Sequence, residues 1–302
     1  MNVDPAIAPR WRTLSDEDRE REYSPSSCTG GSFEPFIEQY VARSEAARLA
    51  AAADGLELHV LHYGTAEPQS IDIVVPANQS ETQAPPIVVY IHGGYWQLLS
   101  KSESFFAAPD ALANGWAFAA VDYTLAPHAT LDEIVHECKA AVGAVRDNAG
   151  TLGIDPDRIY VCGSSAGGHL SAMVGLGLDD GWRPAGVGLI SGVFELEPLI
   201  GTSINDAVQL DQDEAVRNSP MLKDLTGFPP ALLAWGDNET DEFKRQSRSF
   251  RQLLDEAGTT ATDMEIVERN HFDVVLDLCD TASPLGEAMA QLVNRTTAND
   301  TL

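Results

Sequence analysis

The chain has 302 residues, of which 44% are hydrophobic, so it can bury a sizeable core within one α/β domain. Its formal charge of −27 repels phosphate backbones and anionic lipid surfaces, so nucleic-acid and membrane partners are not expected. The expected partner is a small-molecule substrate.

The cysteines lie far apart in the chain, without a CxxC pair or a regular spacing: Cys28, Cys138, Cys162 and Cys279. Neither a zinc site nor a disulfide framework is indicated, and we expect reduced thiols.

The first residues do not form a basic region followed by an apolar one, and no apolar run reaches membrane-spanning length. We expect a cytoplasmic protein. The oligomeric state is left open, with a homodimer as one option.

Residues 1–31 are polar and acidic, and prolines and glycines interrupt them. We therefore expect an N-terminal arm ahead of a single domain over residues 32–302. Apolar residues then recur at helical spacing, which predicts a helix lying on an apolar surface: Phe33, Phe36, Ile37, Tyr40 and Val41.

The following segments have the patterns of strands. Two alternate apolar and other residues on either side of a turn, which predicts an antiparallel hairpin at a sheet edge: 56–60 and 71–75. Continuous apolar runs, typical of strands covered on both faces, follow at 87–91, 117–121, 159–162, 187–190 and 231–235. A short last strand is predicted at 264–267.

The connections between these runs are long enough for crossover helices, including 131–148 and 167–178. The sequence therefore predicts the α/β class, with a mostly parallel, doubly wound sheet. Between about 195 and 230 the strand pattern is lost over a stretch too long for a plain loop. We interpret this stretch as a helical cap above the sheet.

A G-x-S-x-G sequence runs from Gly163 to Gly167, directly between a predicted strand and a small-residue helix. This setting is typical of a nucleophile elbow, a turn so sharp that its flanking positions cannot carry a Cβ. Ser165 is the candidate nucleophile. The alternative is a glycine- and serine-rich loop between a strand and a helix.

A second glycine turn follows the strand at 87–91. Backbone N–H groups there can face the negative charge that acyl transfer builds on a carbonyl oxygen, so we assign Gly93, Gly94 and the N–H of Ala166 to an oxyanion hole. Tyr95 and Trp96 come next, as candidates either to line an aryl pocket or to pack beneath the cap. We expect His92 to hold the turn by hydrogen bonding, and His169, one helical turn after Ser165, to have a packing role.

The strand at 231–235 ends in three acids that compete to orient a catalytic base: Asp237, Glu239 and Asp241. Asp241 also fits the start of the next helix, and we choose Glu239. His271 follows the last strand, where a base must lie to reach the elbow. The order Ser165, Glu239, His271 is that of the α/β-hydrolases.

Five stretches together resemble kynurenine formamidases (arylformamidases), on the hormone-sensitive-lipase-like side of the α/β-hydrolases. The stretches are His92-Gly93-Gly94-Tyr95-Trp96, Asp122-Tyr123-Thr124-Leu125-Ala126-Pro127, Gly163-Ser164-Ser165-Ala166-Gly167-Gly168-His169, Glu242-Phe243-Lys244-Arg245-Gln246-Ser247 and Asn270-His271-Phe272. The resemblance covers roughly residues 32–295. It departs from the family at the acid, where better-known members have Gly-x-x-Asp and this chain has Gly236 followed by Glu239.

The resemblance implies an α/β-hydrolase fold and a serine hydrolase that removes a formyl group from an aryl amine of the N-formylkynurenine kind through an acyl-enzyme. It also implies a place in tryptophan catabolism. The chemistry needs neither a metal nor an organic cofactor. Two alternatives stay open: a carboxylesterase for short-chain or aryl esters, and a non-catalytic ligand-binding member of the fold.

Overall fold

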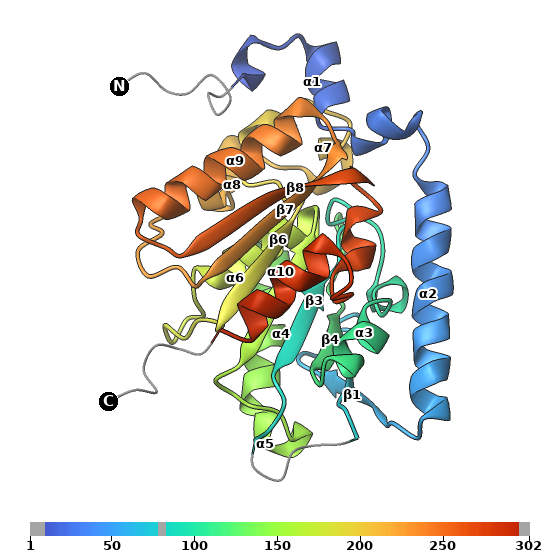
Figure 1. Ribbon diagram of the computed structural model, residues 1–302. Helices are drawn as coiled ribbons and strands as arrows, with labels where there is room; N and C mark the ends of the chain where they lie inside the picture. The colour runs from blue at the N-terminus through green and yellow to red at the C-terminus, as the bar shows by residue number, and fades with distance from the viewer. Residues whose placement is uncertain (1–9, 78–82, 296–302) are drawn as a thin grey trace.

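A computed structural model describes residues 10–77 and 83–295, whose core is one mixed sheet flanked by helices (Figure 1). Its strands are β1 (Leu58–His62), β2 (Ser70–Val74), β3 (Ile87–Ile91), β4 (Ala117–Val121), β5 (Ile159–Ser164), β6 (Gly186–Ile190), β7 (Ala231–Asn238) and β8 (Ala261–Asn270). In space they follow the order β1-β2-β4-β3-β5-β6-β7-β8.

The pairing confirms the predicted topology. β1 and β2 form the antiparallel hairpin at one edge, and β2 joins the sheet antiparallel to β4. The remaining neighbours, from β4 through β3 to β8, all pair in parallel. Their carboxyl ends therefore meet at one edge of the sheet, where the elbow and the acid and histidine loops emerge.

The α-helices are α1 (Asp16–Glu22), α2 (Glu34–Ala53), α3 (Ala108–Ala113), α4 (Leu131–Asp147), α5 (Ala149–Leu152), α6 (Ala166–Gly175), α7 (Asn205–Val208), α8 (Gln212–Arg217), α9 (Asp241–Glu256) and α10 (Pro284–Val293). Short 3-10 turns are η1 (Trp11–Thr13), η2 (Pro25–Thr29), η3 (Lys101–Glu103), η4 (Glu197–Leu199), η5 (Pro220–Leu222) and η6 (Val274–Asp277). Within the described ranges, none of the helices combines the length and the apolar character that crossing a membrane requires.

The sheet is covered on both faces, as the continuous apolar runs predict. Along β3, Ile87, Val89 and Ile91 face a core that α4 and α6 complete. Val88 and Tyr90 face the opposite core, which α2, α3 and α10 cover (Figure 1). α9 closes the first face over β6 and β7. Because side chains alternate along a strand, a five-residue run serves both cores.

The segment predicted as a helical cap consists of η4, α7, α8 and η5, joined by turns. These elements are short, so the segment is held by its contacts with its neighbours. α8 lies on α4, and η5 lies on α6. Ile204, just before α7, reaches the cavity described below.

The N-terminal arm was predicted over residues 1–31, of which residues 1–9 lie outside the described part. From residue 10 on it is ordered as η1, α1 and η2, and α1 lies beside α9 (Figure 1). Trp11 and Tyr23 are 7% and 1% exposed, so the arm buries aromatic anchors although its composition is polar. The division into an arm and a domain over 32–302 stays a proposal.

The predicted helix begins at Glu34, and its buried face differs from the expected stripe. Tyr40, Ser44, Ala47 and Ala51 are buried, whereas Val41 is 36% exposed. Each residue turns a helix by about 100°, which carries Val41 off the line of Tyr40 and its successors. The expectation for Val41 was therefore wrong.

Candidate active site

Ser165 occupies the turn between β5 and α6, with backbone angles φ 57° and ψ −120°. The two flanking glycines have no room for a side chain. A Cβ on Gly163 would lie 2.3 Å from the carbonyl oxygen of Gly167, and one on Gly167 would lie 2.0 Å from the carbonyl oxygen of Ile91. The turn therefore requires glycine at both positions, and it holds Ser165 in a strained conformation at the carboxyl end of β5.

The glycine turn after β3 lies against this elbow. A Cβ on Gly93 would come within 2.7 Å of the carbonyl oxygen of Ser164, and Gly94 has a φ of 92°. Among the described residues, no acceptor takes a hydrogen bond from the N–H of Gly93 or Gly94. Ala166 is the first residue of α6, so its N–H has no partner within the helix. These donors can serve an oxyanion.

Glu239 and His271 come from neighbouring strand ends, after β7 and β8, and they meet directly. The Nδ1 of His271 lies 2.9 Å from Oε2 of Glu239, and the two residues are 4% and 7% exposed. The other oxygen, Oε1, accepts hydrogen bonds from the Ser191 hydroxyl and the Gly236 N–H, each at 2.6 Å. The carboxylate is thus fixed on both sides.

The competing acids lie elsewhere. Asp241 is exposed in the first turn of α9 and pairs with Arg10 at 3.2 Å. Asp237 offers its carbonyl oxygen, rather than its side chain, to Lys244. Of the three acids, the structure brings Glu239 to His271.

Aromatic rings surround His271. The ring of Phe243 lies edge-on to it with centroids 4.6 Å apart, and the ring of Phe272 lies at 5.3 Å. The hydroxyl of Tyr40, from α2, donates a hydrogen bond to the carbonyl of Phe272. Asp273 accepts hydrogen bonds from the backbone and side chain of Asn270. The loop that carries the imidazole is therefore held from several directions.

Ser165, His271, Gly93 and Gly94 line one cavity of about 450 Å3. Its other walls come from α2, from the N-terminal arm and from loops after the strands, including Phe33, Ile37, Phe106, Phe272 and residues 23–26. Tyr95 also lines it. Among the described residues that line this cavity there is no lysine or arginine, and Glu103 is the acid. The cavity suits a substrate that is largely apolar and has no net negative charge.

Trp96, a candidate for the same pocket, does not reach it. Its side chain is 0% exposed, and its ring meets the edge of His169 with centroids 5.1 Å apart. Tyr95 and Trp96 both have positive φ, 49° and 60°, and their rings pack against each other with centroids 5.9 Å apart, Tyr95 on the cavity side and Trp96 on the buried side. Tyr95 thus lines the cavity, whereas Trp96 packs in the interior of the protein.

The remaining histidines near the elbow occupy the positions expected of them. His92 stacks on Tyr123 with ring centroids 4.2 Å apart, and its Nδ1 lies 2.9 Å from the carbonyl oxygen of Gly93. His169 is fully buried, and its Nε2 lies 2.6 Å from the carbonyl oxygen of Asn218. Burial lowers the pKa of His169 to about 4, so this imidazole is neutral at pH 7.

Sequence reasoning missed Ser191, Phe243 and the cavity-lining part of the arm. Ser191 follows the buried strand β6, and that position at the carboxyl end of a parallel strand could have identified it. Phe243 belongs to a stretch used for the resemblance, to which no role was given. The arm carried no signal, because its contacts are with residues about 200 positions away.

The chain is similar to known hydrolases. A BD-FAE family model matches residues 71–183. The kynurenine formamidase of Danio rerio is 30% identical over 94% of this chain and 99% of its own length. Carboxylesterase NlhH of Mycobacterium tuberculosis is 32% identical over 58% of this chain and 62% of its own length. A solved Pyrobaculum calidifontis esterase superposes with a TM-score of 0.69, at 22% identity, covering 86% of this chain and 91% of that one.

The sheet order, the elbow and these similarities define the protein as an α/β-hydrolase, and therefore as a hydrolytic enzyme. This confirms the class that the sequence resemblance implied. The match to the Danio rerio enzyme extends over nearly the whole of both chains, so it identifies a family within the α/β-hydrolases. The chain belongs to the kynurenine formamidase family.

Proposed function

We propose that this enzyme hydrolyses the formamide bond of an aryl formamide of the N-formylkynurenine kind. Ser165 is the nucleophile, His271 the general base, and Glu239 the acid that orients it. Gly93, Gly94 and Ala166 bind the oxyanion. The observation that carries the proposal is the 2.9 Å contact between His271 and Glu239, with His271 and Ser165 on the wall of one cavity.

In the first half of the reaction, the Oγ of Ser165 forms a bond to the formyl carbon as its proton passes to Nε2 of His271. The carbonyl oxygen becomes negative and is stabilised by the N–H groups of Gly93, Gly94 and Ala166. Glu239 stabilises the imidazolium through Nδ1. The C–N bond then breaks, and the proton on His271 goes to the leaving amine.

In the second half, a water molecule attacks the formyl-enzyme and gives a proton to His271. The bond to Ser165 breaks, the proton returns to its oxygen, and formic acid leaves and gives its remaining proton to the solvent, becoming formate. The apolar walls of the cavity lower the local dielectric constant, which strengthens the electrostatic stabilisation of both tetrahedral intermediates.

The aryl group belongs, in this proposal, among the aromatic residues of the cavity, with Tyr95 as a substrate-binding residue. Phe33, Phe106 and Phe272 provide flat apolar surfaces on its walls. The name of the Danio rerio relative, kynurenine formamidase, supports this choice of substrate. A cytoplasmic location, a role in tryptophan catabolism and a homodimer belong to the same proposal. The free thiols, three of them buried, fit a reducing compartment.

A carboxylesterase is the second candidate, favoured by the similarity to carboxylesterase NlhH. Both reactions use the same residues, but an amide leaving group needs protonation by His271 more than an ester does. The deciding experiment compares kcat/KM for N-formylkynurenine and for p-nitrophenyl butyrate on one preparation. We expect turnover of the formamide at a kcat/KM equal to or above that of the ester. Ester hydrolysis with the formamide untouched would reject the first candidate.

A further inference from the structure

The N-terminal segment, residues 10–29, contributes no group to the proposed chemistry, yet its residues 23–26 line the cavity. We propose that Tyr23 is a positioning residue of this reaction. Its side chain anchors the segment in a buried polar socket, and the segment holds the loop of Glu239 and the side chain of Tyr95 in place. This inference rests on the proposed function.

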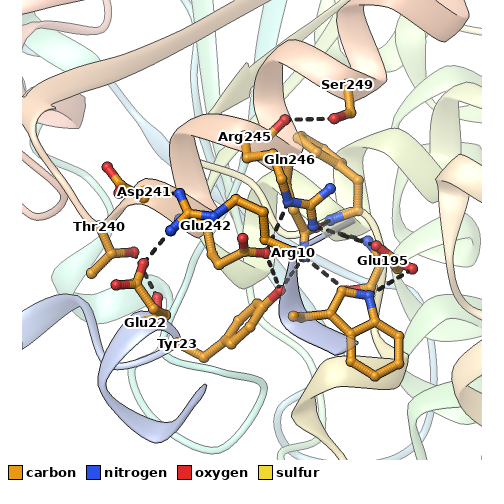
Figure 2. A network of polar contacts seen from close by, with 12 residues as sticks. Arg10, Glu22, Tyr23, Glu195, Thr240, Asp241, Glu242, Arg245, Gln246 and Ser249 are labelled. Carbon is orange, nitrogen blue, oxygen red and sulfur yellow. Dashed lines mark hydrogen bonds and ion pairs between the residues drawn. The ribbon is translucent and has the colours of Figure 1, made fainter. Parts of the chain in front are cut away.

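The socket is formed by the first turns of α9. The Tyr23 hydroxyl donates a hydrogen bond to Oε2 of Glu242 at 2.9 Å and accepts one from Nε2 of Gln246 at 3.2 Å (Figure 2). Nε of Arg245 donates to the same Glu242 oxygen at 2.9 Å. Tyr23, Glu242, Arg245 and Gln246 are each at most 2% exposed. Burial raises the pKa of Tyr23, so its hydroxyl keeps the proton that it donates.

Glu195, at the start of the cap segment, contacts both the socket and Trp11, the other buried aromatic residue of the N-terminal segment. Nη2 of Arg245 lies 3.4 Å from its Oε2, and Nε2 of Gln246 donates to its carbonyl oxygen at 3.0 Å (Figure 2). The indole N–H of Trp11 donates to Oε1 of Glu195 at 3.0 Å. A buried network of this kind stabilises through its paired members, and the second oxygen of Glu242, Oε1, already has no partner among the described residues. Removal of the Tyr23 hydroxyl leaves Glu242 with one donor fewer.

The anchored segment touches the residues on both sides of Glu239. The Thr240 hydroxyl donates to the carbonyl oxygen of Glu22 at 2.6 Å, and the Asn238 amide donates to that of Cys28 at 3.1 Å. The backbone N–H of Glu242 donates to the Glu22 carboxylate at 3.2 Å. The acid of the proposed triad therefore sits in a loop that the segment holds before and after it.

Two more contacts lead from Tyr23 toward the reacting atoms. The hydroxyl of Tyr95, next to Gly94, donates to the carbonyl oxygen of Tyr23 at 2.6 Å. The ring of Tyr23 lies 6.4 Å from that of Phe243, which packs against His271. Release of the segment would thus disturb the acid loop, the ring beside the imidazole and the wall of the cavity together.

The test compares Tyr23→Phe with Tyr160→Phe. Tyr160 is also a buried tyrosine whose hydroxyl donates to a carbonyl, that of Val293 at 2.9 Å, but it does not line the cavity. We expect Tyr23→Phe to lower kcat about tenfold and to shift the acid limb of the kcat/KM profile, because small misplacements of catalytic groups have large effects. Tyr160→Phe should change neither.

Limited trypsin digestion measures whether the N-terminal segment stays docked on the rest of the protein. Cleavage after Arg19 and Arg21 should be faster in Tyr23→Phe than in the wild type, and unchanged in Tyr160→Phe. Unchanged kinetics together with faster cleavage would overturn the proposal, because the segment would then be free without affecting the reaction. Equal effects of the two substitutions on all readouts would also overturn it, since they would mark a general loss of stability.

Should Tyr23→Phe fail to fold, Thr240→Val is the second variant, since it removes only the hydrogen bond to Glu22 and leaves the socket. The same drop in kcat is expected, and an unchanged kcat and pH profile would reject the proposal. The kcat and the pH profile of each variant are compared with those of the wild type, on whichever substrate, formamide or ester, the wild type hydrolyses. Failure to hydrolyse formamides would reject the proposed function, while the ester would still test the role of Tyr23.

Discussion

Glu239 reaches Nδ1 of His271 with one carboxylate oxygen, at 2.9 Å, while its other oxygen is held by Ser191 and the backbone of Gly236. The two residues follow neighbouring parallel strands, β7 and β8, so the sheet itself brings them together. The carboxylate is fixed independently of the imidazole that it orients. In the proposed mechanism, this arrangement favours the tautomer of His271 with the proton on Nδ1, which leaves Nε2 to accept one from Ser165.

Replacement of Glu239 by glutamine should lower kcat by about 1,000-fold, because an amide neither enforces this tautomer nor stabilises the imidazolium. Steady-state kinetics on the better substrate measure the loss. Asp237→Asn is the matched control, and we expect it to retain wild-type rates. A Glu239→Gln enzyme with near wild-type kcat, beside an impaired Asp237→Asn, would move the acid to Asp237.

The elbow makes a prediction about stability. Gly167→Ala places a Cβ 2.0 Å from the backbone oxygen of Ile91, which cannot move without displacing β3. We expect the unfolding free energy in urea to fall by at least about 3 kcal/mol, or the variant to be insoluble. Gly150→Ala, where a Cβ meets nothing within 4 Å, should be neutral or slightly stabilising. Equal stabilities of the two variants would contradict the described geometry of the turn.

The buried His169 should make the free energy of unfolding depend on pH. Burial lowers its pKa from 6.5 in the unfolded chain to about 4 in the native one, so between these values the unfolded state binds the proton more tightly. This group has no effect above pH 6.5. As the pH falls from 6.5 to 4, it should remove up to about 3 kcal/mol of unfolding free energy.

His169→Gln keeps a donor near the Asn218 carbonyl but cannot titrate in this range. Urea unfolding at several pH values should therefore give a shallower pH dependence for His169→Gln than for the wild type. Identical slopes for the two proteins would show that His169 is not the titrating group.

Charge in the cavity predicts a preference among substrates. Glu103 accepts a hydrogen bond from the Ser100 hydroxyl at 2.8 Å, and no lysine or arginine is found among the described residues that line the cavity. A charge of the same sign about 10 Å away costs about 1.5 kcal/mol at an effective dielectric constant of 20. We expect kcat/KM for 4-formamidobenzoate to be about tenfold below that for 4-formamidobenzamide.

The control for this preference is Glu103→Gln, which should narrow the gap between the two formamides. A gap of the same size in the variant would mean that Glu103 does not sense the substrate charge. A preference for the anionic formamide would contradict the assignment of the cavity to substrates without net negative charge.

The strands were predictable because strands buried on both faces are apolar throughout, as residues 87–91 and 159–162 are. The elbow and the order of Ser165, Glu239 and His271 follow from local patterns. Tyr23 and Glu242 are 219 positions apart, and each lies in a stretch that looks like ordinary polar surface. Their pairing depends on the finished fold. The inward turn of Trp96 likewise depends on backbone angles that no pattern of apolar residues encodes.

Whether Ser165 is the nucleophile is measured by the intact mass of the protein after treatment with a fluorophosphonate, which reacts with an activated serine. The wild type should gain one phosphonyl group, and Ser165→Ala should gain none. Ser171→Ala should be labelled like the wild type, because Ser171 is 0% exposed and its hydroxyl has no hydrogen-bond partner among the described residues. Labelling of Ser165→Ala at the wild-type rate, or an unlabelled wild type, would show that Ser165 is not an activated nucleophile.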